Sequence, residues 1–104
     1  MEKISNFYGK PFNPEDWNDI MAVVNKIESL SENRDIWFQY TSCSVMLTVE
    51  QRDKTGTRLR KEDGSFKDHI RFHKHSNRPI SVNAMRRSIL DIIEQFLTVY
   101  YNGK

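Results

Sequence analysis

The 104-residue chain has few residues that form disulfides or favour turns, with one cysteine, three prolines and four glycines. The single cysteine, Cys43, excludes an internal disulfide and favours a reducing compartment. No apolar run approaches the ~20 residues that span a bilayer, and the N-terminus lacks the apolar segment of a signal peptide. We therefore expect a cytoplasmic protein with no membrane partner.

The sequence also lacks the motifs that carry enzymatic chemistry. It contains no nucleophile elbow, phosphate loop, dinucleotide fingerprint or HExxH pattern. Cys43 could pair with a histidine as a nucleophile, but no third group is evident, and a lone cysteine is more often a small buried apolar residue. We expect no enzyme, no catalytic residue, no cofactor and no small-molecule substrate.

The residues that are present support one domain over residues 1–104. Apolar residues make up 38% of the chain and aromatic residues 12%, which is enough for one modest core. Charge is unevenly distributed: residues 1–51 carry four Lys or Arg and eight Asp or Glu, whereas residues 52–104 carry twelve and six. Such asymmetry hints at a directed electrostatic surface.

The first third of the chain predicts an arm and a helix. Residues 1–12 are expected to form an irregular aromatic arm, bent at Gly9-Lys10-Pro11. A helix is predicted over residues 13–32, with Asn13 as N-cap and Pro14 at the first helical position. Its apolar stripe at helical spacing consists of Trp17, Ile20, Met21, Val24, Ile27 and Leu30.

Residues 35–75 predict an antiparallel meander of three to four strands. The apolar alternation changes parity within residues 36–51, so the chain should turn back near Thr41–Ser44, with a β-bulge near Ser42 as the lesser alternative. Residues 52–68 predict a polar hairpin with two turn signals and a short edge strand over residues 57–61. A strand over residues 66–75 follows.

A second helix is predicted over residues 81–102, with Ser81 as N-cap and Asn102-Gly103 as its stop. The complete pattern is α+β: N-terminal helix, antiparallel meander and C-terminal helix. It is compatible with a two-layer arrangement or an αβα sandwich, because the sequence does not decide which sheet face each helix covers.

Three histidines suggest a metal site. Residues two apart on a strand share a face, so His73 and His75 could bind one ion together, with His69 on the same face. Zinc wants three or four such ligands, and Asp63, Asp68 or Cys43 could complete the set. The competing interpretation is a hydrated strand face among Lys67, Arg71 and Lys74, whose charges oppose a cation.

Basic residues of the polar hairpin suggest nucleic-acid binding. A two-stranded ribbon of this kind can lie against phosphates, although neighbouring carboxylates and a solvated edge that resists strand pairing explain the same residues. The candidate nucleic-acid contacts are Arg58, Arg60, Lys61, Lys67, Arg71 and Lys74.

The second helix suggests a protein interface. Its apolar face is wide, and more apolar surface than one small sheet can cover indicates a partner protein or self-association. The alternative is a helix fully buried on its own sheet. The candidate interface residues are Ile92, Phe96, Val99 and Tyr100.

The helix opening Asn13-Pro14-Glu15-Asp16-Trp17, the short meander from Asp35 and the closing helix from Ser81 to Tyr101 weakly resemble small αβα sandwich domains encoded by phages and prophages. The resemblance rests on length and element order. It implies a compact accessory protein without catalytic residues. The leading hypothesis is therefore a non-enzymatic module that binds a partner protein or itself, with nucleic-acid binding and metal binding as alternatives.

Overall fold

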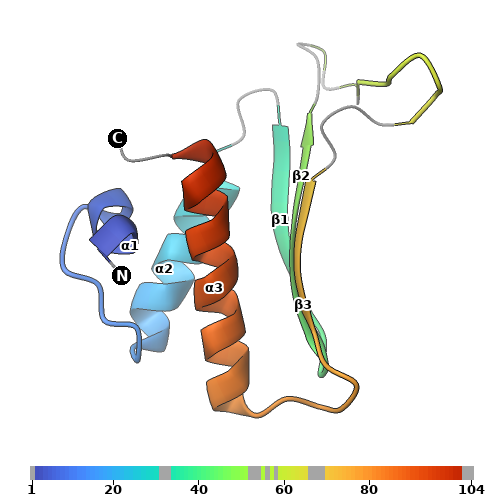
Figure 1. Cartoon of the computed structure of the whole chain (residues 1–104). Coiled ribbons are helices and arrows are strands. Elements are labelled where there is room, and N and C mark those ends of the chain that lie inside the picture. The colour runs from blue at the N-terminus through green and yellow to red at the C-terminus, as the bar shows by residue number, and fades with distance from the viewer. Residues whose placement is uncertain are drawn as a thin grey trace.

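The computed structural model describes residues 2–30, 34–51, 55, 57, 59–65 and 70–101. The predicted α+β class is confirmed, with a three-stranded sheet between helical segments (Figure 1). The elements are α1 (Glu2–Tyr8), α2 (Trp17–Glu28), β1 (Arg34–Tyr40), β2 (Ser44–Gln51), β3 (Ile70–His75) and α3 (Val82–Tyr100). In the described part of the chain, no helix is long and apolar enough to cross a membrane.

The sheet is an antiparallel meander in the order β1-β2-β3. The predicted reversal near Thr41–Ser44 is confirmed, since the Thr41 N–H donates to the Ser44 carbonyl at 2.9 Å and β1 pairs with β2. This reversal explains the change of parity, because even positions in β1 and odd positions in β2 then face the same side. That side is apolar and buried: Ile36, Phe38, Val45, Leu47, Val49 and Phe72.

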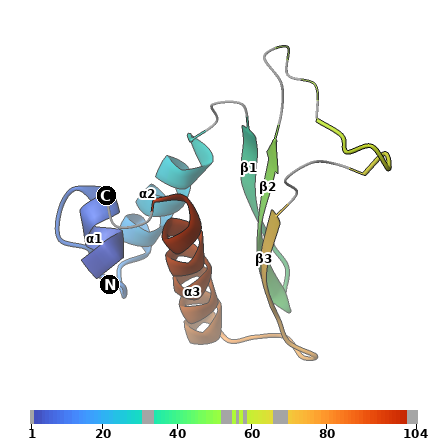
Figure 2. The ribbon, with the colours of Figure 1, turned by 45° about the horizontal axis from the view of Figure 1, so that its top comes forward.

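Both long helices lie on the same face of the sheet (Figures 1 and 2). α2 packs against β1, while α3 packs against β2 and β3. α1 packs on α2 and α3 and lies on the far side of them from the sheet. The arrangement is therefore the two-layer alternative and not the αβα sandwich, and among the described helices none covers the opposite sheet face. We call that opposite face the open face.

The N-terminal arm departs from the sequence prediction. Residues 1–12 were expected to be irregular, whereas Glu2–Tyr8 is helical. The reason is tertiary: Ile4 and Phe7 lie one turn apart and are both buried, and the Phe7 ring meets Tyr101 edge-on at 5.3 Å between centroids. Gly9, at φ 83°, ends the helix, a conformation that favours glycine.

α2 begins later and ends earlier than the helix predicted over residues 13–32. Asn13 caps a turn instead, accepting from the Glu15 N–H at 3.0 Å, and Asp16 is the helix N-cap, accepting from the Asn18 N–H at 2.9 Å. Both Asn13 and Asp16 have side chains that can accept a hydrogen bond at a helix N-cap. Asp16 is the N-cap in the structure, and the helix that starts after it buries its apolar face in the core. The helix ends at Glu28, with Ser29 as C-cap.

The C-terminal helix matches its prediction closely. Ser81 is the N-cap and its hydroxyl accepts from the Ala84 N–H at 3.1 Å, while Tyr101 is the C-cap. The predicted stop at Asn102-Gly103 lies outside the described residues. The helix supplies the largest share of the core, through Ile89, Leu90, Ile92, Ile93, Phe96 and Leu97.

The polar hairpin is described only in part, and its second turn is confirmed. The Lys61 N–H donates to the Ser65 carbonyl at 2.7 Å around Gly64, whose φ is 88°. Hydrogen bonds from the Ser65 hydroxyl and N–H lower the pKa of Asp63. Of the predicted edge strand 57–61, the described positions show a single bridge, at Arg60. Residues 66–69 of the predicted strand 66–75 lie outside the described residues.

The division between core and surface on α3 predicts unequal effects of truncation. Phe96 is 1% exposed and Val99 is 55% exposed. Phe96→Ala should lower the free energy of unfolding by about 3–5 kcal/mol because it leaves a cavity in the core. Val99→Ala should change it by no more than about 0.5 kcal/mol. Urea denaturation followed by circular dichroism measures both, and equal losses would contradict this helix orientation.

Candidate functional site

The two edges of the sheet present their backbones differently. At the β1 edge, the Phe38 N–H points away from β2 and donates to Glu28 Oε2 of α2 at 3.0 Å. A side chain of the neighbouring helix thus occupies the middle of that edge. Natural proteins commonly guard an edge strand with a charged side chain, because unpaired amides otherwise recruit another strand.

The β3 edge has no comparable cover in the described part of the structure. The Ser76 N–H donates to the Cys43 carbonyl at 2.9 Å, which sets the alternation of the antiparallel β2–β3 ladder. Phe72 and Lys74 therefore direct their backbone groups to β2, whereas His73 and His75 direct theirs outward. No strand among the described residues pairs with this outer side.

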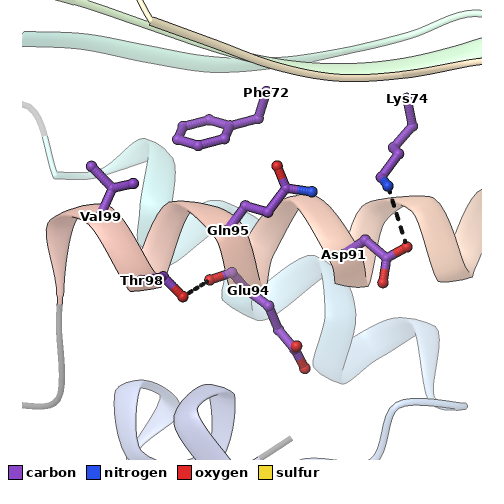
Figure 3. A pocket seen from close by; sticks show the side chains of 7 residues that line it. All are labelled: Phe72, Lys74, Asp91, Glu94, Gln95, Thr98 and Val99. Carbon is purple, nitrogen blue, oxygen red and sulfur yellow. Dashed lines mark hydrogen bonds and ion pairs between the residues drawn. The ribbon is translucent and has the colours of Figure 1, made fainter.

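A groove of about 620 Å³ runs between β3 and α3, along that outer side. We call it the β3–α3 groove. Figure 3 shows Phe72 and Lys74 projecting from the strand toward the helix, with Gln95 between them. Its lining residues are Phe72, Lys74, Asp91, Glu94, Gln95, Thr98 and Val99.

The groove is apolar at one end and charged at the other. Phe72 and the exposed Val99 form the apolar end, while Lys74 Nζ and Asp91 Oδ2 are 3.8 Å apart at the charged end (Figure 3). Both partners of this ion pair are solvent-exposed, so it contributes little to stability and can rearrange around another charge. The groove therefore combines apolar contact with adaptable polar contact.

The open face of the sheet carries a second set of side chains. Strand alternation places the following residues there: Trp37, Gln39, Met46, Thr48, His73 and His75. Thr48, in the central strand, is nevertheless only 1% exposed. His73 and His75 are exposed, with ring centroids 5.7 Å apart.

Of the predicted basic surface, the structure describes the side chains of Arg60, Lys61 and Lys74. Arg60 and Lys61 lie at the second hairpin turn, where Arg60 Nη1 donates to the Gly64 carbonyl at 2.7 Å. Lys74 faces α3, and its Nζ lies 3.8 Å from Asp91 Oδ2. The remaining candidates, Arg58, Lys67 and the side chain of Arg71, lie outside the described residues.

The predicted helix interface is half core and half surface. Ile92 and Phe96 are buried against the sheet, so placing them in an interface was wrong. A wide apolar face looks the same in sequence whether its own sheet or a partner covers it. Val99 is exposed in the β3–α3 groove, and Tyr100 is half-buried with its ring 4.9 Å from that of Phe96.

Of the predicted metal ligands, the structure describes His73, His75, Asp63 and Cys43. His69 and Asp68 lie outside the described residues. Asp63 is engaged by Ser65 in the hairpin turn, and Cys43 lies in the β1–β2 connection. Within the described ranges, no group of three or more His, Cys, Asp or Glu side chains could hold a metal ion.

Sequence reasoning missed the groove itself. Its helical wall is a polar stripe at spacings i, i+4 and i+7, formed by Asp91, Gln95 and Thr98. That stripe reads as the solvent side of an amphipathic helix. The one available signal was the parity of β3, which separates Phe72 and Lys74 from His73 and His75.

No family model matches this chain, no curated protein matches it, and no solved structure matches it; the comparisons identify no enzyme family.

The pKa of Tyr40 depends on Glu28, the residue that covers the β1 edge. It lies at the end of β1 and its ring stacks on Phe38 at 6.1 Å. Partial burial raises the pKa of Tyr40 to about 12, and the negative charge of Glu28 adds to the rise. Since the unfolded chain releases this proton near pH 10, the stability linked to Tyr40 is complete below about pH 10 and is lost as the pH rises toward 12.

Glu28→Gln should lower the pKa of Tyr40 part of the way toward 10, because burial remains while the carboxylate charge disappears. The amide oxygen of Gln can still accept from the Phe38 N–H, so the strand edge stays covered. Absorbance titration of tyrosinate measures the shift, with Tyr40→Phe as the control that identifies its contribution. An unchanged Tyr40 midpoint would show that Glu28 does not face this hydroxyl.

Proposed function

We propose that this chain is a non-enzymatic protein-interaction module that binds an extended segment of a partner protein along the outer edge of β3. The observation that carries the proposal is the coincidence of two features: outward-directed backbone groups at His73 and His75, and a groove directly beside them. Addition of a strand to an exposed edge is a recurrent mode of peptide recognition.

The division of labour follows from strand geometry. The partner's backbone exchanges hydrogen bonds with β3, and its alternate side chains enter the β3–α3 groove. An apolar side chain fits against Phe72 and Val99, while a polar or charged one meets Lys74 and Asp91. The backbone contacts supply affinity for any extended segment, and the groove supplies selectivity among side chains.

The asymmetry of the edges favours β3 over β1. Glu28 already accepts from the Phe38 N–H, so a strand added at β1 would have to displace that carboxylate. Displacement would leave a charged acceptor without its partner, which opposes binding. The β3 edge carries no such penalty among the described residues.

The biological setting belongs to the same proposal. Cys43 is a free thiol, which suits a reducing compartment, and we infer a cytoplasmic location. An accessory protein of the phage or prophage kind, as the element order suggests, would act by binding other proteins. The partner is a separate protein in this proposal, and self-association through the same edge is a distinguishable outcome of the test.

Backbone recognition predicts that proline at an outward-directed position blocks binding. His73→Pro removes one outward N–H and is tolerable in an edge strand, because that N–H does not bond β2. Peptides are first selected from a random display library on the wild-type chain. They should bind His73→Pro about tenfold more weakly, because the variant loses one backbone hydrogen bond to the peptide. Calorimetric titration measures this.

His73→Ala is the matched control, because it removes the same imidazole and keeps the N–H; it should bind like wild type. Thermal denaturation establishes that both variants fold. Selected peptides that bind His73→Pro undiminished, or a library that yields no binder, would refute edge recognition. If the peptide-free protein sediments as a dimer and His73→Pro dissociates that dimer, the edge binds a second copy of this chain and not a partner protein.

A further inference from the structure

The exposed histidine pair has no structural role within the described residues. His73 and His75 lie on the open face, away from both packed helices, with ring centroids 5.7 Å apart and planes at 39°. Neither imidazole has a hydrogen bond or an ion pair with another described residue. A pair of imidazoles two residues apart on one strand face is a ready chelate, since both rings project to the same side.

A third soft donor lies across the ladder from this pair. Met46 of β2 is the register partner of His73. The Ser76–Cys43 bond makes odd residues of β2 hydrogen-bonded partners of β3, so Met46 and His73 form a non-hydrogen-bonded pair. In such pairs the Cα atoms are only about 4.5 Å apart and the side chains lie close together. Met46 is partly exposed on the open face.

The donor types select the metal. Zinc sites use imidazole, thiolate and carboxylate ligands and need three or four of them, but no His, Cys, Asp or Glu joins the pair within the described ranges. A thioether is a soft ligand that favours monovalent copper, and imidazole also suits copper. Two imidazoles and one thioether therefore match Cu(I) better than Zn(II).

We propose that His73, His75 and Met46 form a binding site for one monovalent copper ion on the open face of the sheet. The three side chains come from two adjacent strands whose backbones are paired in the ladder, so the spacing of their Cα atoms is set before the ion arrives. The ion would lie on the face opposite the β3–α3 groove. The site is independent of the proposed protein binding and needs no partner.

The ion can be tested directly with Cu(I) and with Ag(I), a redox-inert ion of the same charge and softness. All proteins in the test carry Cys43→Ser, because a free thiol is itself a strong Cu(I) ligand and would mask the site. Anaerobic titration against a coloured Cu(I) chelator gives affinity and stoichiometry. Methyl-labelled methionine spectra with Ag(I) identify the thioether, since Met1, Met21 and Met85 are internal references.

We expect one Cu(I) per chain and a selective shift of the Met46 methyl with Ag(I). Met46→Leu, which preserves volume, should weaken Cu(I) binding by at least about tenfold and leave any Ni(II) binding to the histidine pair unchanged. Met21→Leu is the matched control and should leave Cu(I) binding unchanged. His73→Gln and His75→Gln should each weaken Cu(I) and Ni(II) alike.

Equal Cu(I) affinity in the Met46→Leu and parent proteins would overturn the proposal, as would an Ag(I) shift at Met21 or Met85 in place of Met46. Zn(II) that binds as tightly as Cu(I) would also overturn it, because the thioether then plays no part in selection. Thermal denaturation of each variant without metal confirms that a loss of binding is not a loss of fold.

Discussion

One-sided burial of the central strand is the constraint on which the rest of the structure depends. Val45, Leu47 and Val49 of β2 are almost completely buried against the helical layer. Their alternation fixes the register of β1 on one side and β3 on the other, because a slip by one residue would turn apolar side chains to solvent. Both helices are then drawn to the same face. The open face, the guarded β1 edge and the β3 edge all follow.

The candidate groove is a product of this layering and not of any motif. α3 contacts β2 and β3, so it lies beneath the last strand of the sheet with polar residues on its outer flank. β3 is the last strand of the sheet, and α3 forms the other wall of the groove beside it. The groove lies between the edge strand and the helix beside it, and its described lining comes from these two elements.

Sequence reasoning succeeded where a single element contains its own explanation. The reversal near Thr41–Ser44 follows from parity, and the Ser81 cap follows from a local acceptor before an apolar stripe. It failed where the explanation lies in another element. The α1 helix depends on burial of Ile4 and Phe7 against distant residues, while Gly9-Lys10-Pro11 alone reads as loop. Ile92 was misplaced for the same reason: periodicity gives the apolar face but not what covers it.

The candidate sites show the same boundary. Pairing of His73 with His75 was readable from spacing on one strand, but the neighbouring Met46 required the register of a second strand. The wall formed by Asp91, Gln95 and Thr98 required the position of a helix relative to a strand edge. Strand parity also separates neighbours on β3, since Lys74 faces α3 whereas His73 and His75 lie on the open face.

The six residues of β3 therefore contribute side chains to two different surfaces. Even positions supply the groove and odd positions supply the open face, so one strand carries two unrelated chemistries. A slip of one residue in the pairing of β3 with β2 would leave the sequence unchanged yet exchange the two faces. Such a change would bury imidazoles against α3 and expose Phe72, and would abolish both surfaces in one step.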